Sequence, residues 1–202
     1  MINDILYGQN YNSVVASIKD YAKSHIKQSR YEHSERVAEM CVQICKRYGL
    51  NEKQGYLAGI SHDICKSFSD EDMIKYASKD GLQISDYERK KTALLHGRAA
   101  AVILKEQFDI EDEEVLEAVA NHTSGTMGMG DISKVLFLAD KIEPGRPQST
   151  DEYRERLFKL SLNGFLSNVL IENYEYITKK GYEVYPETKK MVEYYKSLSE
   201  NE

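Results

Sequence analysis

Histidine and aspartate residues are the groups in this sequence best suited to chemistry. Four of the five histidines, together with two aspartates, have apolar neighbours three and four residues away, as on the buried face of a helix. These six residues are His33, His62, Asp63, His96, His122 and Asp140. A buried imidazole is satisfied by hydrogen bonding, whereas a buried carboxylate is costly unless a cation compensates it. One shared cation therefore explains the set more economically than six separate polar core residues.

The donor set also restricts which cation would bind. Imidazole nitrogen mixed with carboxylate oxygen suits iron, manganese, zinc or cobalt better than calcium or magnesium, which prefer oxygen ligands alone. The three cysteines, Cys41, Cys45 and Cys65, lie among apolar residues and are odd in number. We expect them to be reduced core residues. A transition-metal site of one or two ions is the prediction.

Helical periodicity and capping signals indicate the elements that would position these side chains, and alternating strand patterns are nearly absent. We expect an all-α fold, in which residues 1–202 form a single domain. Its motif-bearing core covers about residues 29–146, and extra C-terminal helices cover about residues 151–200. The expected helices are 14–26, 31–48, 52–66, 70–79, 93–108, one beginning at 111–114, 132–142, 153–180 and 187–199.

Composition and charge exclude several classes of protein. The hydrophobic fraction of 41% and the charged fraction of 30% are ordinary for a globular domain, and no run is long and apolar enough to span a bilayer. A net charge of −6 gives no general attraction to nucleic acid. The first ten residues lack a basic leader followed by an apolar stretch, so a cytoplasmic protein is expected. The expected partner is a small molecule, and a homodimer is left open.

The order of the metal-binding candidates resembles that of a known superfamily. His33, the adjacent pair His62 and Asp63, and a distant Asp140 are similar to the signature of HD-domain metal phosphohydrolases. The resemblance narrows to the YqeK group of symmetrical diadenosine tetraphosphate hydrolases and covers about residues 29–188. It is carried by the segments HDICK (62–66), LLHGRAAA (94–101), NHTSG (121–125) and LADKIEPGR (138–146). The resemblance implies an HD-domain fold and hydrolysis of diadenosine tetraphosphate at its centre, giving two ADP.

The resemblance implies a metal-binding role for the signature residues. His33, His62, Asp63 and Asp140 would ligate the ion, with iron as first choice and manganese, cobalt, nickel or zinc as alternatives. His33, Asp63 and Asp140 would also border the substrate. The bound metal would supply hydroxide near neutral pH for attack on phosphorus. Asp63 is expected to orient or deprotonate the attacking water.

The same resemblance places further residues around the phosphates. Lys66, His96, His122, Thr123 and Arg146 would contact the substrate. Lys66 and Arg146 would add positive charge where the transition state spreads negative charge, and His96 or His122 would protonate the leaving ADP. Asp63, Lys66, His96 and His122 are therefore the expected catalytic residues.

The sequence departs from the family near its C-terminus. Tyr185 precedes Pro186, at a position where the family commonly has a histidine. The tyrosine would stack on a base or sugar of the substrate, or it would be an ordinary half-buried aromatic before a helix. We expect it to border the nucleotide.

Two other functions fit the same residues. An HD enzyme could act on a guanosine alarmone, a deoxynucleotide or a nucleoside phosphate instead, because substrate choice depends on the shape of the pocket. A non-catalytic nucleotide-binding module is the other alternative, although such modules usually lose metal ligands. A purely structural metal site would leave Lys66 and Arg146 unexplained.

Overall fold

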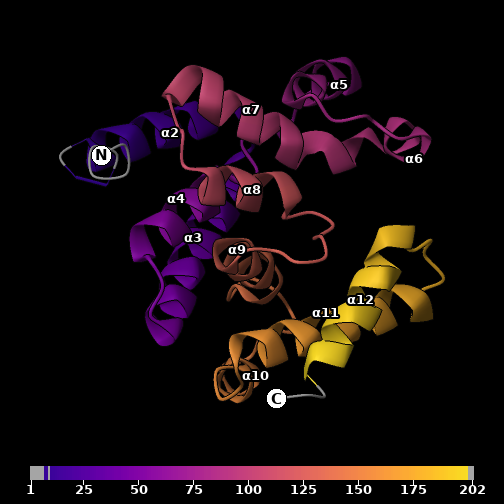
Figure 1. Ribbon diagram of the computed structural model, residues 1–202. Helices are drawn as coiled ribbons and strands as arrows, with labels where there is room; N and C mark the ends of the chain where they lie inside the picture. Colours follow the sequence, from indigo (N-terminus) through magenta and orange to yellow (C-terminus); the bar gives the residue numbers. More distant parts are fainter. Residues whose placement is uncertain (1–6, 9, 200–202) are drawn as a thin grey trace.

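The computed structural model describes residues 7, 8 and 10–199, and helices account for most of this part of the chain (Figure 1). No strand occurs among the described residues, which confirms the all-α expectation. The elements, in chain order, are α2 (Tyr11–His25), α3 (Gln28–Tyr48), α4 (Glu52–Ser61), α5 (Asp70–Ala77), the 3-10 helix η1 (Ser78–Asp80), α6 (Asp86–Lys90), the 3-10 helix η2 (Thr92–Leu95), α7 (His96–Phe108), α8 (Glu113–Asn121), α9 (Asp131–Ile142), α10 (Asp151–Leu157), α11 (Leu162–Lys179) and α12 (Pro186–Ser199).

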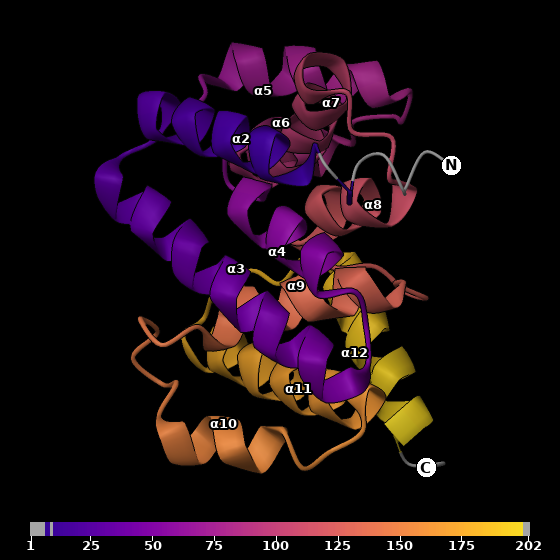
Figure 2. The same cartoon turned by 90° about the vertical axis from the view of Figure 1, so that its left-hand side faces the viewer.

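Helix α9 lies near the middle of the molecule, as both ribbon views show (Figures 1 and 2). Nine of its twelve residues are buried, including Asp140, because it packs against α3, α4, α8 and α11. A helix that is apolar on nearly all sides is expected in such a central position. In Figure 2, α2 and α5–α7 lie on one side of this central group and α10–α12 on the other. One hydrophobic core joins the two sides, from Tyr11 to Tyr195.

The histidines lie at helix ends more often than the periodicity indicated. Helix α4 was expected to continue to about Lys66, but it ends at Ser61, and residues 62–67 form turns. The His62 Nδ1 atom forms a 2.7 Å hydrogen bond with the Gly59 carbonyl oxygen. The Ser61 hydroxyl donates to the Leu57 carbonyl, also at 2.7 Å. These side-chain bonds compete for carbonyls that a continuing helix would use. The helix therefore ends at Ser61, and His62 lies directly after its last turn.

Three other boundaries differ from the expectation. The predicted helix 93–108 is a 3-10 turn followed by α7, which begins at His96 itself. The predicted helix 153–180 is wrong, because the chain turns after α10 and Ser161 caps a new helix by accepting from the Gly164 N–H. Helix α6 was not predicted, although Ser85 and Glu88 form a full capping box at its start.

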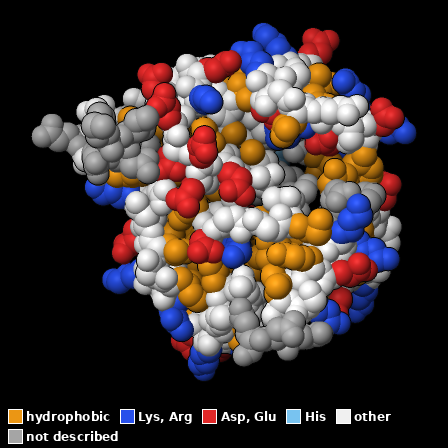
Figure 3. Space-filling view, in the orientation of Figure 1, with side chains coloured by type: hydrophobic (Ala, Val, Ile, Leu, Met, Phe, Trp, Pro, Cys, Tyr) orange, Lys and Arg blue, Asp and Glu red, His pale blue; other side chains and the backbone are white. Residues whose placement is uncertain are grey.

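The surface and the core agree with the composition. Cys41, Cys45 and Cys65 are free and buried, as expected for packing residues. No helix in the described ranges has both the length and the apolarity needed to cross a membrane. On the face shown in Figure 3, acidic and basic side chains are interspersed and no continuous basic patch is visible.

Helices α3 and α4 approach closely at Gly59, which makes this glycine a stability determinant. A Cβ atom there would lie 2.5 Å from Ala38 Cα and 2.8 Å from Ala38 N, both backbone atoms of α3. We expect Gly59→Ala to lower the free energy of unfolding by at least about 2 kcal/mol, because the helices must separate. Urea unfolding measures this. Gly164→Ala is the matched control, because its Cβ would meet only side-chain atoms, the Ser161 hydroxyl at 3.2 Å and Leu160 Cβ at 3.6 Å; equal effects of both would contradict the packing argument.

Candidate metal centre

Side chains from five parts of the chain converge on one cavity of about 240 Å³. They come from α3, the turn after α4, the start of α7, the turn after α8, and the end of α9 with the segment that follows it. The lining residues are Arg30, Asp63, Lys66, His96, His122, Thr123, Asp140, Lys141 and Arg146. The fold thus brings together residues that the sequence analysis selected at widely separated positions.

Three of the histidines are held in the same tautomer by the same device. In each, Nδ1 lies within hydrogen-bonding distance of the backbone carbonyl three residues earlier. The pairs are His62 with Gly59, His96 with Ala93, and His122 with Val119. A carbonyl can only accept, so Nδ1 carries the hydrogen and donates it. In the neutral form of each ring, the Nε2 atom is then left with a lone pair, as a metal ligand requires.

His33 is oriented by a carboxylate instead. Its Nδ1 lies 3.0 Å from Glu143 Oε1, and Glu143 is itself held by Arg36 Nε at 2.6 Å. The His33 Nε2 atom approaches Asp140 Oδ1 to 3.1 Å, but without hydrogen-bond alignment. The buried Nε2 atoms of His33 and His62 have no hydrogen-bond partner among the described residues. Buried acceptors of this kind are rare without a ligand, so these two nitrogens fit a bound cation.

Two overlapping groups of ligand atoms fit a metal ion. His33, His62 and Asp140 offer three atoms within 4.8 Å of one another, and His62, Asp63 and His122 offer another three. His62 is shared by both groups. Imidazole nitrogens combined with carboxylate oxygens match the ligand preferences of transition metals. The residues present therefore fit the metal that the sequence predicted.

Asp63 is the most heavily surrounded carboxylate of the site. Its side chain is 3% exposed and lies 3.1 Å from Arg30 Nη1, 3.9 Å from Lys66 Nζ and 2.9 Å from His96 Nε2. Burial alone would raise the pKa of Asp63, but His62 and hydrogen bonds from the neighbouring imidazoles hold it well below its usual value. Asp63 is therefore ionised at neutral pH, and its carboxylate oxygens are suited to bind a metal ion.

Asp140 has its own pair of cations. Lys141 Nζ lies 2.7 Å from Oδ2, and the Arg146 guanidinium donates to Oδ1 and to the Asp140 backbone carbonyl. Burial opposes ionisation, yet the positive charges of Lys141 and Arg146, with the adjacent imidazoles, keep the pKa of Asp140 well below its usual value. Both carboxylates of the site thus stay charged although they are buried.

His96, His122 and Lys66 complete the wall of the cavity. The Nε2 atoms of His96 and His122 are 2.9 Å apart, a contact that one proton shared between them makes favourable. Burial, with the nearby His96 and His62, lowers the pKa of His122 to about 4, against the opposing effect of Asp63. His122 is therefore neutral at pH 7 and better suited to accept or ligate than to donate a proton. Burial also lowers the pKa of Lys66, whose amine lies 3.2 Å from His96 Nε2.

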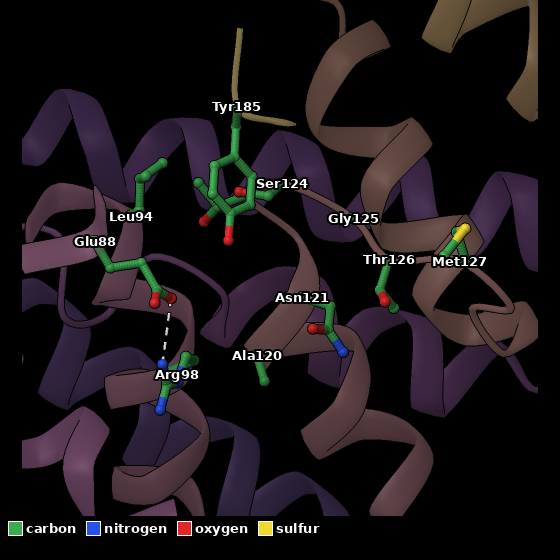
Figure 4. A pocket seen from close by; sticks show the side chains of 11 residues that line it. Glu88, Leu94, Arg98, Ala120, Asn121, Ser124, Gly125, Thr126, Met127 and Tyr185 are labelled. Carbon is green, nitrogen blue, oxygen red and sulfur yellow. Dashed lines mark hydrogen bonds and ion pairs between the residues drawn. The ribbon is translucent and has the colours of Figure 1, made fainter. Parts of the chain in front are cut away.

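Tyr185 does not line this cavity. It extends from the segment before α12 into a neighbouring cavity of about 200 Å³, which Leu94, Ser124 and Asn121 also line (Figure 4). Its ring centroid lies 5.0 Å from that of Tyr87. Thr123 lines both cavities, and its hydroxyl lies 3.5 Å from the Nε2 atoms of His96 and His122. Tyr185 is thus separated from the metal ligands but adjoins the same surface.

Three charged residues of the site were not predicted from the sequence. Arg30 is one helical turn before His33, Lys141 follows Asp140 directly, and Glu143 lies in the LADKIEPGR segment. Each lies close in the sequence to a predicted site residue, and this spacing was the available indication of its role. Taken alone, however, a charged side chain on a helix is most often solvated, and only the structure shows which partners these three contact.

Glu143 is expected to tune the metal affinity through His33. Glu143→Gln keeps the shape but weakens the hold on both His33 and Arg36, so we expect metal affinity to fall by about 10–100-fold. Equilibrium titration of metal into the apo protein measures this. Glu39→Gln, on the exposed face of α3, the helix that carries His33, is the control. An affinity within twofold of wild type for Glu143→Gln would show that the carboxylate only packs.

Comparisons with known proteins agree with this geometry. The HD domain family model matches residues 30–145. The chain is 34% identical to the symmetrical bis(5'-nucleosyl)-tetraphosphatase of Halalkalibacterium halodurans over 82% of this chain and 88% of that protein. It is 31% identical to the protein of the same name from Staphylococcus aureus, over 90% and 94%.

A solved structure extends the likeness to three dimensions. A Clostridium acetobutylicum protein described as a "predicted HD superfamily hydrolase involved in NAD metabolism" matches with a TM-score of 0.83 and 28% identity, over 91% of this chain and 97% of that one. The region matched by the HD domain family model, residues 30–145, contains the histidine and aspartate residues of the cavity. The chain therefore belongs to the HD-domain family of phosphohydrolases.

Proposed function

We propose that this protein hydrolyses diadenosine tetraphosphate symmetrically, adding one water and releasing two ADP. The observation that carries the proposal is the cavity itself, where the histidine and aspartate cluster lies beside four cationic side chains. These are Arg30, Lys66, Lys141 and Arg146. A net charge of −6 would otherwise repel a polyphosphate. The names of the most similar curated relatives support the same substrate.

The metal ligands follow from the two groups of donor atoms. His33, His62, Asp63 and Asp140 would hold the ion, and His122, a member of the second group, would complete a second position beside the shared His62. Iron is the metal we propose. When bound, the metal supplies Lewis-acid activation of water and neutralises phosphoryl charge.

The protein's own residues position the substrate and manage its charge. Lys66 and Arg146 flank the cavity and would bind phosphate oxygens on either side of the bond that breaks. Asp63, with two oxygens in the site, would orient the attacking water. His96 is the proton donor to the leaving ADP that we propose in place of His122, whose pKa is lowered to about 4. Thr123 offers a hydroxyl to the same phosphates.

A product assay with a metal panel tests the function. Protein purified without chelator is loaded with iron, manganese or cobalt and given diadenosine tetraphosphate in ¹⁸O-labelled water. We expect ADP as sole nucleotide product, with the label in the β-phosphate of one ADP of each pair. Formation of AMP and ATP would overturn symmetrical cleavage. Faster hydrolysis of a guanosine alarmone or a deoxynucleotide in the same panel would overturn the substrate assignment.

A further inference from the structure

A third cavity, of about 840 Å³, adjoins the metal centre on the side of the C-terminal helices; we call it the α11 cavity. It shares a wall with the metal centre, because Asp140, Lys141 and Arg146 line both. Its far wall comes from α10 and α11 and consists of Tyr153, Val169, Glu172, Asn173 and Tyr176. The cavity of about 200 Å³ that contains Tyr185 meets the metal centre elsewhere, at Thr123.

A substrate cleaved at its centre needs room for two similar arms. The bond that breaks must lie at the metal, so each nucleoside with its two phosphates extends away from it. The cavity at the metal, about 240 Å³, is too small for the arms as well as the reacting phosphates. The α11 cavity falls in the size range of small-molecule sites and begins at two cations. It therefore suits an anionic chain that ends in a larger group.

The far wall offers the chemistry that a purine base requires. Tyr176 is 59% exposed; Lys180 Nζ lies 5.8 Å from its ring centroid, and among the described residues no aromatic ring stacks on it. Asn173 lies one helical turn earlier, on the same face of α11. An aromatic face stacks on a base, and an amide can both donate to a ring nitrogen and accept from an exocyclic amine. These are the two contacts that recognise adenine.

The other polar groups of the wall already bind each other. The Tyr153 hydroxyl donates to the Glu172 carboxylate, and Arg156 Nη2 lies 2.9 Å from the same carboxylate. These contacts fix α10 against α11 and keep the cavity open. Tyr176 and Asn173 are the residues left to contact a ligand.

We propose that the α11 cavity binds one nucleoside of the dinucleotide, with its base on Tyr176 and Asn173 and its phosphates on Lys141 and Arg146. The inference rests on the proposed function and deepens it. It assigns the C-terminal helices, which lie outside the matched HD region, to recognition of one arm of the substrate. The other arm would then extend on the Thr123 side.

Substitution of Tyr176 tests the subsite. We expect Tyr176→Ala to lower kcat/KM for diadenosine tetraphosphate by about tenfold or more, because the stacking face is lost. Hydrolysis of inorganic tetraphosphate, which has no base, should stay unchanged, and Tyr176→Phe should retain wild-type values. Tyr182→Ala removes a tyrosine that is 64% exposed and outside the cavity, and is the control. Calorimetric titration with ADP should show two sites per wild-type chain and one per Tyr176→Ala chain.

The outcomes separate the inference from the function on which it rests. If wild type cleaves diadenosine tetraphosphate and Tyr176→Ala keeps both its kcat/KM and two ADP sites, the subsite is wrong while the function stands. If wild type does not cleave this substrate, the function is wrong, and the ADP titration alone decides the subsite. Asn173→Asp adds a readout of base identity, because a carboxylate can accept from guanine but cannot donate to adenine. An unchanged preference between diadenosine and diguanosine tetraphosphate would exclude Asn173 from base recognition.

Discussion

Replacement of His62 by alanine is expected to abolish metal binding and to reduce turnover by at least about a thousandfold. His62 is the residue shared by the two groups of ligand atoms, so its loss removes a nitrogen from both. Its Nδ1 is fixed on the Gly59 carbonyl, and its Nε2 is buried without a hydrogen-bond partner among the described residues. No neighbouring side chain can take over this position, because the ring is fully buried between α3 and the other histidines.

Elemental analysis and thermal unfolding measure the effect independently of activity. Metal at about a hundred times its dissociation constant should stabilise the wild-type protein by about 2.7 kcal/mol, and a chelator should remove that gain. The unfolding temperature of His62→Ala should not respond to either. His25→Ala, an exposed histidine of α2, should behave as wild type. Retention of stoichiometric metal by His62→Ala would contradict the assignment of the site.

The residue types that converge at the candidate metal centre were predictable from sequence, but their exact positions on the helices were not. Periodicity placed His62 and His122 within helical faces, whereas both lie just past a helix end. The reason is local: each ring donates to the carbonyl three residues earlier, which a periodic pattern does not encode. The burial of Asp63 and Asp140, inferred from their apolar neighbours, is confirmed.

Contacts between side chains that are far apart in the sequence could not be inferred from residue spacing. Glu143 holds His33 over a separation of 110 residues, and this pairing depends on how α3 lies against the end of α9. The break between α10 and α11 was missed for a similar reason. The pattern over residues 153–180 is that of one amphipathic helix, but Ser161 caps a new helix within it. This break allows the rings of Phe158 and Phe165 to pack with their centroids 5.7 Å apart. The α11 cavity depends on that break.

Asp63→Asn should separate the charge of this carboxylate from its shape. The amide has nearly the same volume, so the cavity should keep its form, but the negative charge that faces Arg30, Lys66 and the imidazoles disappears. We expect metal affinity to fall because an amide is a weaker ligand for transition metals than a carboxylate. At saturating metal, kcat should still be at least about a hundredfold lower, because the amide cannot accept a proton from water.

Measurement of kcat across a range of metal concentrations distinguishes these two contributions. If Asp63 is only a ligand, enough metal restores kcat; if it also orients or deprotonates the water, kcat stays low when the site is full. Asp20→Asn, an exposed carboxylate on α2, controls for the change of net charge. Full recovery of kcat at saturating metal would show that Asp63 is not the base that deprotonates the attacking water. Since His122 is neutral at pH 7 and lies 3.7 Å from Asp63 Oδ1, it would then be the remaining imidazole able to accept that proton.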